Sequence, residues 1–155
     1  MNESLLVGQA CTKYNYLQIN YQCLPNLPTK NICANSRSEL SHAYIVTPDF
    51  PNKLTAGANC ECTLSTNFEN GQILLRRLDM KLPNDHENQK CGGTYLEINE
   101  NDKSTERKCG YVREAGSIFG SGSKKLKLNF YTGENDNFYD SGFWLEVLGK
   151  KLKIW

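Results

Sequence analysis

The sequence predicts an all-β fold, a β-sandwich or jelly roll. Apolar and polar residues alternate with a period of two in several short segments, which is the pattern of half-buried strands. Gly, Pro, Asn and Ser separate these segments at turn-like spacing, and no segment keeps a helical period. Many short strands with turns between them are typical of sandwiches and jelly rolls.

Composition narrows the class of protein. With 155 residues the chain has room for one ordinary domain and a little more. Its formal net charge of +1 provides no general attraction for nucleic acid, and no apolar run reaches the roughly 20 residues that a bilayer span needs. Seven cysteines are typical of a secreted, disulfide-bonded protein. We therefore expect an extracellular location, for a secreted protein or an ectodomain.

The first element is a strand within 14–23, where Leu17, Ile19 and Tyr21 alternate with polar residues. About two dozen residues cannot bury a core alone, so residues 1–24 are interpreted as the end of another domain. Two prolines in residues 25–32 indicate a linker. Residues 1–8 lack the features of a signal peptide, and we expect the sequence to be a fragment of a longer secreted protein.

The main domain is predicted at 33–149, followed by a basic tail at 150–155. A short strand over 43–47 is stopped by Pro48, and a second strand covers 60–65. In the strand over 72–80, apolar residues change phase at Arg76 and Arg77, which predicts a β-bulge.

The later strands are expected at 95–98, 115–119, 124–131 and 142–148. The segment 99–108 is too polar to bury and is predicted to be a loop. In 124–131 the pattern places Leu126, Leu128 and Phe130 inward and Lys125, Lys127 and Asn129 outward.

Residues 33–148 together resemble a CUB domain. The resemblance depends on an ordered set of motifs: Tyr44-Ile-Val-Thr-Pro-Asp-Phe-Pro51, Cys60-Glu-Cys-Thr-Leu64, Leu78-Asp-Met80, Cys91 with Tyr95-Leu-Glu-Ile98, Cys109-Gly110, Lys125 to Phe130, and Gly142-Phe143. It implies a sandwich of two mostly antiparallel sheets. It also implies disulfides Cys33–Cys60 and Cys91–Cys109.

The resemblance also identifies positions for metal and for a free thiol. Many CUB domains hold calcium through three acidic positions, which here are Lys81, Thr94 and Gly133. A hard cation prefers six to eight oxygen ligands, so no metal or other cofactor is expected at these positions. A calcium site built instead from Asp85, Glu87 and Glu134 is the alternative.

Cys62 occupies a position where the family usually has a core Trp. We expect a buried reduced thiol there, with pairing to Cys33 as the alternative.

Residues 7–23 resemble the last strand of a SUEL-type galactose/rhamnose-binding lectin domain. Val7-Gly-Gln-Ala-Cys11 stands where that family has Gly-Asp-Pro-Cys, and Tyr21-Gln-Cys23 closes the domain. The resemblance implies that the longer protein combines a lectin domain with a CUB domain. The state of Cys11 and Cys23 stays open.

Catalytic motifs are incomplete in this sequence, and we expect no enzyme. His42 and His86 are its two histidines, and the His86-Glu87 pair is followed by Lys90 where a zinc protease has a second histidine. Candidate partner-binding residues are Lys125 and Lys127, which with Lys124, Lys150, Lys151 and Lys153 could contact sulfated glycans; a solvated strand face with a basic tail is the favoured alternative. Phe138 and Tyr139 are candidates for an exposed aromatic edge, and Trp144 is either part of that edge or a core residue. The CUB resemblance implies a non-catalytic binding module for extracellular protein or glycan partners. The alternative is an accessory CUB domain of a secreted protease whose catalytic domain lies outside the sequence.

Overall fold

The structure is a computed structural model that describes residues 23–34, 37–39, 41–83, 90–100, 104–112, 114–134 and 142–151. Side chains are described for all of these residues except 37–39, 104 and 105.

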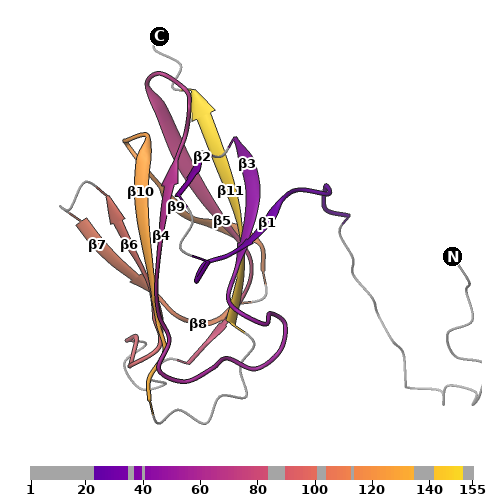
Figure 1. Cartoon of the computed structure of the whole chain (residues 1–155), viewed down its shortest axis with the longest axis vertical. Coiled ribbons are helices and arrows are strands. Elements are labelled where there is room, and N and C mark those ends of the chain that lie inside the picture. The colour runs from indigo at the N-terminus through magenta and orange to yellow at the C-terminus, as the bar shows by residue number, and fades with distance from the viewer. Residues whose placement is uncertain are drawn as a thin grey trace, which may run out of the picture.

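Two sheets face each other across one core (Figure 1). The first sheet has the order β1 (Thr29–Asn31), β3 (His42–Val46), β11 (Gly142–Lys151), β5 (Gly71–Leu82) and β8 (Gly110–Val112), and β9 (Gly116–Gly120) also pairs with β5. The second sheet has the order β2 (Arg37–Glu39), β4 (Asn59–Ser65), β10 (Lys125–Tyr131), β6 (Tyr95–Glu100) and β7 (Ser104–Lys108). The pairs β1–β3 and β2–β4 are parallel and the others are antiparallel. The predicted all-β sandwich of two mostly antiparallel sheets is confirmed.

The core lies between the inner faces of the sheets. Leu126, Leu128 and Phe130 of β10 are buried, as their alternation with polar residues predicts. The ring of Phe130 meets that of Phe143 on β11 edge to face, with 5.4 Å between the ring centroids. This contact joins the central strand of one sheet to the central strand of the other, and aromatic pairs in this geometry add stability beyond their buried area.

β5 carries the predicted bulge. Leu75 and Met80 both face the core, although five positions separate them and strict alternation would place them on opposite faces. The pairing with β11 shows why: Trp144 lies opposite Asp79, whereas the next residue, Leu145, lies opposite Arg77. Leu78 is therefore the extra residue, two positions beyond the Arg76 at which the sequence changes phase.

The prediction of a loop over 99–108 is wrong. β6 continues to Glu100, and β7 returns beside it as an antiparallel edge strand. An edge strand needs no buried face, so polar side chains do not prevent pairing there. Arg107 of β7 instead bonds to Glu97 across the pair, with 3.2 Å between Nε and Oε2.

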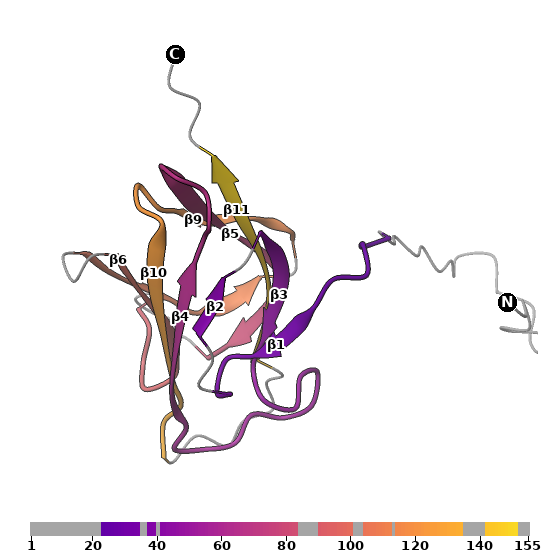
Figure 2. The same cartoon turned by 45° about the horizontal axis from the view of Figure 1, so that its top comes forward.

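Residues 25–32, predicted as a linker, contribute to the sandwich. β1 lies beside β3 at the sheet edge (Figure 2), and Ile32 is fully buried. The amide of Tyr44 donates to the carbonyl of Pro28 at 2.8 Å. Proline is compatible with an edge strand because the backbone N–H that it lacks would point to solvent and not to a neighbouring strand. Lys150 and Lys151, predicted in a tail, end β11, and the predicted strand at 14–23 lies outside the described residues except for Cys23.

Candidate interaction surface on the first sheet

Two disulfides connect the segments that frame the sandwich. Cys33–Cys60 joins the residues after β1 to β4, with 4.7 Å between Cα atoms, and Cys91–Cys109 joins the segment before β6 to the residue before β8, with 5.6 Å. These are the two pairs that the family resemblance implies. Cys62 is buried in the core outside any disulfide, and Cys23 is exposed and free of one.

The three positions that the family resemblance assigns to calcium ligands carry groups that are poor ligands for a calcium ion. The ammonium of Lys81 pairs with Asp79, with 3.3 Å between Nζ and Oδ2. The amide of Gly133 donates to the hydroxyl of Thr94 at 3.0 Å. This bond brings Thr94 and Gly133 together. The Thr94 hydroxyl already accepts a hydrogen bond and glycine has no side-chain oxygen, whereas calcium needs several carboxylate oxygens. Within the described ranges no three His, Cys, Asp or Glu side chains gather as a metal site. Asp85 and Glu87 lie outside those ranges, and Glu134 is exposed.

The outer face of the second sheet carries the predicted lysines of β10. Lys127 pairs with Glu61 of β4, with 2.8 Å between Nζ and Oε2, and Lys125 is exposed. Their role in partner binding stays a prediction. Phe138 and Tyr139, the other two predicted contact residues, lie outside the described residues.

Glu97 organises the polar side chains beside these lysines. Its carboxylate accepts from Asn99 at 3.2 Å, from Asn129 at 3.4 Å and from Arg107. Burial raises the pKa of Glu97, but the three hydrogen bonds and the charge of Arg107 outweigh it, so the pKa lies below its usual value. Asn129, predicted to face outward, is covered by this network and is only 9% exposed. The carboxylate of Glu97 is occupied by its three neighbours, so we interpret the network as structural.

A hollow of about 450 Å³ opens on the outer face of the first sheet, and it is lined by Phe50, Leu78, Asp79, Lys81 and Trp144. We call these five residues the Trp144 surface. β11 supplies Trp144, and β5 supplies the three residues around its bulge. Phe50 comes from the turn that follows β3, in which its amide donates to the carbonyl of Thr47 at 3.3 Å. Pro48 ends β3 at this turn, since proline cannot donate to the ladder.

The indole of Trp144 is held by rings on two sides. Its centroid lies 5.4 Å from that of Tyr44 in an edge-to-face contact and 6.2 Å from that of Phe50. Tyr44 is itself fixed, because its hydroxyl donates to the carbonyl of Pro25 at 3.0 Å. Burial and the charge of Glu146 raise the pKa of Tyr44, so the phenol keeps this proton at neutral pH.

Two polar atoms at the Trp144 surface are buried without a hydrogen-bond partner in the described part of the chain. They are Nε1 of Trp144, a donor, and Oδ1 of Asp79, an acceptor. The two residues lie directly opposite each other on β11 and β5. Unsatisfied buried polar groups are uncommon and each one calls for an explanation.

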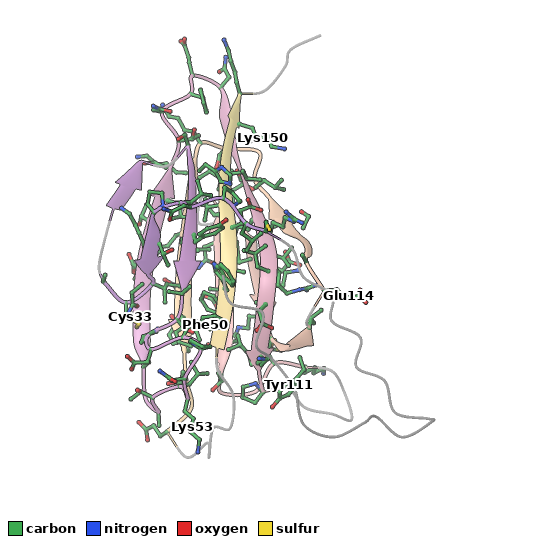
Figure 3. The ribbon with its side chains drawn as sticks, turned by 90° about the vertical axis from the view of Figure 1, so that its right-hand side faces the viewer. Cys33, Phe50, Lys53, Tyr111, Glu114 and Lys150 are labelled. Atoms are coloured by element: carbon green, nitrogen blue, oxygen red, sulfur yellow. A yellow bond between two sulfur atoms is a disulfide. The ribbon has the colours of Figure 1, made fainter. Side chains whose placement is uncertain are left out.

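Tyr111 extends this aromatic region to the edge of the sheet. It lies on β8 opposite Lys81 and is 54% exposed. Figure 3 views this face, with the labels of Phe50 and Tyr111 in its lower half. Sequence reasoning missed the surface because its members come from three separate segments of the chain, and Tyr111 belongs to a fourth.

A charged cluster lies farther along the same face. Glu146 is buried and accepts from His42 Nε2 at 2.7 Å and from Arg76 Nη1 at 3.2 Å. These side chains belong to β11, β3 and β5, so the two contacts connect three neighbouring strands. Both carboxylate oxygens are occupied, and we interpret the cluster as structural.

The comparisons with known proteins agree with this architecture. The profile of the CUB domain matches residues 33–146. The chain therefore belongs to the CUB domain family. No curated protein sequence matches it. No helix in the described ranges is long and apolar enough to cross a membrane.

Several solved structures share the fold. The CUB2 domain of MASP-1 bound to Ca2+ has 18% identity and a TM-score of 0.62, covering 75% of this chain and 99% of that one. The CUB1-EGF-CUB2 domain of human MASP-1/3 has 22% identity and a TM-score of 0.64, covering 76% and 42%. The full extracellular region of zebrafish Gpr126/Adgrg6 has 15% identity and a TM-score of 0.65. The match covers 79% of this chain and only 15% of that one. CUB domains are extracellular interaction modules and are generally non-catalytic.

Proposed function

We propose that this chain is a non-catalytic binding module of a secreted or cell-surface mosaic protein, and that it recognises a protein partner through the Trp144 surface. The observation that carries the proposal is the aromatic hollow on the outer face of the first sheet, with Tyr111 exposed beside it. Trp and Tyr are the residues most enriched among those that dominate binding energy at protein interfaces.

The chemistry of the hollow favours a polypeptide partner. A polypeptide presents apolar and charged side chains together, and the lining of the hollow combines both kinds of contact. The side chains of Phe50 and Leu78 offer apolar contact to a neighbouring side chain of the partner. The pair formed by Asp79 and Lys81 at the rim adds charge complementarity, which mainly improves specificity and association rate.

The scaffold also suits binding. Trp144 lies on a central strand that pairs on both sides, and Tyr44 and Phe50 restrict its ring. A side chain that is already ordered loses little conformational entropy when a partner binds. The surface is therefore pre-organised at the positions that would contribute most to affinity.

The proposed context is a mosaic protein. Residues 1–24 resemble the end of a SUEL-type lectin domain, which favours a lectin–CUB protein over the accessory part of a protease. Sequencing the reading frame on both sides of this chain tests the context. The remaining lectin strands are expected directly upstream, and a zinc motif or a catalytic triad in the same frame would contradict it.

The binding proposal is tested with the full chain, multimerised and applied to an array of purified extracellular domains from its own source organism. The dissociation constant of each hit is then measured for Tyr111→Ala and Phe50→Ala. Each substitution removes an aromatic contact and is expected to weaken binding at least tenfold. Phe68→Ala is the matched control, because Phe68 is also an exposed aromatic residue but is absent from the Trp144 surface. Unchanged binding in both test variants, or an equal loss in the control, would contradict the proposal.

A further inference from the structure

Four exposed lysines gather at one end of the sandwich: Lys124, Lys125, Lys150 and Lys151. We call this region the lysine end. Lys124 and Lys125 stand at the beginning of β10 in the second sheet, whereas Lys150 and Lys151 stand at the end of β11 in the first. The fold thus brings together two basic pairs that are 25 positions apart in the sequence.

The turn between β4 and β5 connects the two pairs. On one side, the amide of Thr66 donates to the carbonyl of Lys124 at 3.0 Å. On the other side, Lys151 lies opposite Gly71, whose amide donates to the carbonyl of Phe68 at 3.0 Å. Both lysine pairs therefore flank one turn, residues 66–70.

The backbone geometry shows where Lys151 points. A Cβ on Gly71 would approach the side chains of Thr66 and Phe68. Residues directly opposite each other in an antiparallel pair project to the same side of the sheet. Lys151 thus projects toward the turn, while Lys150 projects from the outer face of the first sheet (Figure 3).

The charges of these lysines are uncompensated by partners. None of the four ammonium groups makes an ion pair or a hydrogen bond within the described ranges, in contrast to Lys127, which pairs with Glu61. The acidic side chains that the structure describes at this end are Glu69 in the turn and Glu100 at the end of β6, close to Gly122. Among the described side chains, four lysines against two glutamates leave an excess of positive charge at this end.

A hollow of about 390 Å³ lies between the turn and the first lysine pair, and it is lined by Ser65, Thr66, Asn67, Phe68, Glu69, Lys124 and Lys125. Its wall combines hydroxyl and amide groups with the ring of Phe68, which is 36% exposed. Such a lining offers hydrogen bonds to hydroxyl groups and an apolar face for a sugar ring, beside two cations.

We propose that the lysine end binds a sulfated glycan. The cations come from two sheets that pack about 10 Å apart, so they are spread too widely for one small anion and match an extended polyanion. Lysine suits this role because its ammonium attracts anions as a point charge without fixed geometry. An anionic lipid surface fits less well, since the anionic leaflet of a cell membrane faces the cytoplasm and CUB domains are extracellular.

The lysine end is independent of the Trp144 surface. Trp144 and Lys150 are six positions apart on β11, which corresponds to about 20 Å along a strand. Substitutions at one surface therefore leave the other in place, and the two proposals can fail separately.

The test measures binding of the full chain to a heparin oligosaccharide by titration calorimetry at several salt concentrations. Lys125→Gln/Lys151→Gln removes one cation from each pair. Each lysine near an anionic surface contributes about fivefold in affinity, so this variant is expected to bind at least tenfold more weakly. Because bound cations release counterions from a polyanion, the slope of log affinity against log salt is expected to fall by about two.

Matched variants separate the site from net charge. Lys53→Gln/Lys90→Gln removes two exposed lysines outside the lysine end and is expected to bind like the wild type, as is Lys125→Arg/Lys151→Arg. An equal loss in the first control would show that only net charge matters and would overturn the proposal. Equal affinity for hyaluronan, which carries carboxylates but no sulfate, or binding to phosphatidylserine vesicles without binding to heparin, would overturn it as well.

Discussion

Gly142 begins β11, two residues before Trp144, and Gly142→Ala is expected to destabilise the protein strongly. The residue has a φ of +88°, a conformation that L-residues rarely adopt. An added Cβ would lie 1.9 Å from Oγ1 of Thr47 and 2.9 Å from Cδ2 of Leu54. The same Thr47 oxygen accepts from the amide of Phe143 at 3.2 Å, so moving it breaks a buried hydrogen bond.

The expected cost has three parts. Placing alanine at positive φ costs about 1–2 kcal/mol. Overpacking against Leu54 costs about 1–3 kcal/mol, and losing the hydrogen bond at Thr47 costs about 1 kcal/mol. Together they predict a loss of about 3–6 kcal/mol in the free energy of unfolding, which is large against the typical total of about 5–15 kcal/mol.

Gly57→Ala is the matched control, because it tests only the cost of placing alanine at positive φ. Gly57 has a φ of +70°, but a Cβ there would meet nothing within 4 Å. Urea unfolding of both variants gives the comparison. The two remaining parts amount to about 2–4 kcal/mol, so with a slope of about 2 kcal/mol/M, Gly142→Ala is expected to unfold about 1–2 M earlier than Gly57→Ala. Equal midpoints would refute the reasoning from the contact at Thr47.

Three further predictions concern charge, covalent links and metal. Folding lowers the pKa of Glu97 below its usual value of 4.5. The ionised carboxylate therefore stabilises the fold fully at pH values above 4.5, and this stabilisation is lost as the pH falls through the pKa of the folded state. The stability gap between wild type and Glu97→Gln in urea unfolding should thus be full at pH 7 and shrink below pH 4.5; a constant gap would contradict this. Replacing both Cys91 and Cys109 by Ala should cost about 2–4 kcal/mol in the same assay, and a loss under 1 kcal/mol would disagree with a structural disulfide. Because Lys81 places a cation at a ligand position, millimolar calcium should leave the melting temperature unchanged; a rise of several degrees that a chelator reverses would reveal ligands elsewhere.

The central strands could be predicted from the sequence because burial on one face imposes a pattern. Leu126, Leu128 and Phe130 alternate with polar residues, and their strand lies in the middle of its sheet. Edge strands carry a weaker signal. β7 is polar because it covers no core, and β1 follows two prolines, so both were predicted as irregular segments.

The candidate surface was harder to predict than the fold, since it depends on register between distant segments. Phe50, Trp144 and Tyr111 belong to three parts of the chain, and no local pattern places them on one face. The lysine end differs in this respect. Its two basic pairs are visible in the sequence, but only the pairing of Lys151 with Gly71 shows that they share a turn.

The bulge at Leu78 connects the fold to the proposed function. Before the bulge, Ile73 and Leu75 point into the core. With strict alternation, Asp79 and Lys81 would lie on the same face as these two residues. Both charges would then face the core, where an ionised group is costly even when it is paired. The extra residue reverses the alternation, so Met80 takes the core position and the two charged side chains lie outside beside Trp144. One inserted position therefore completes the core and builds the polar rim of the Trp144 surface.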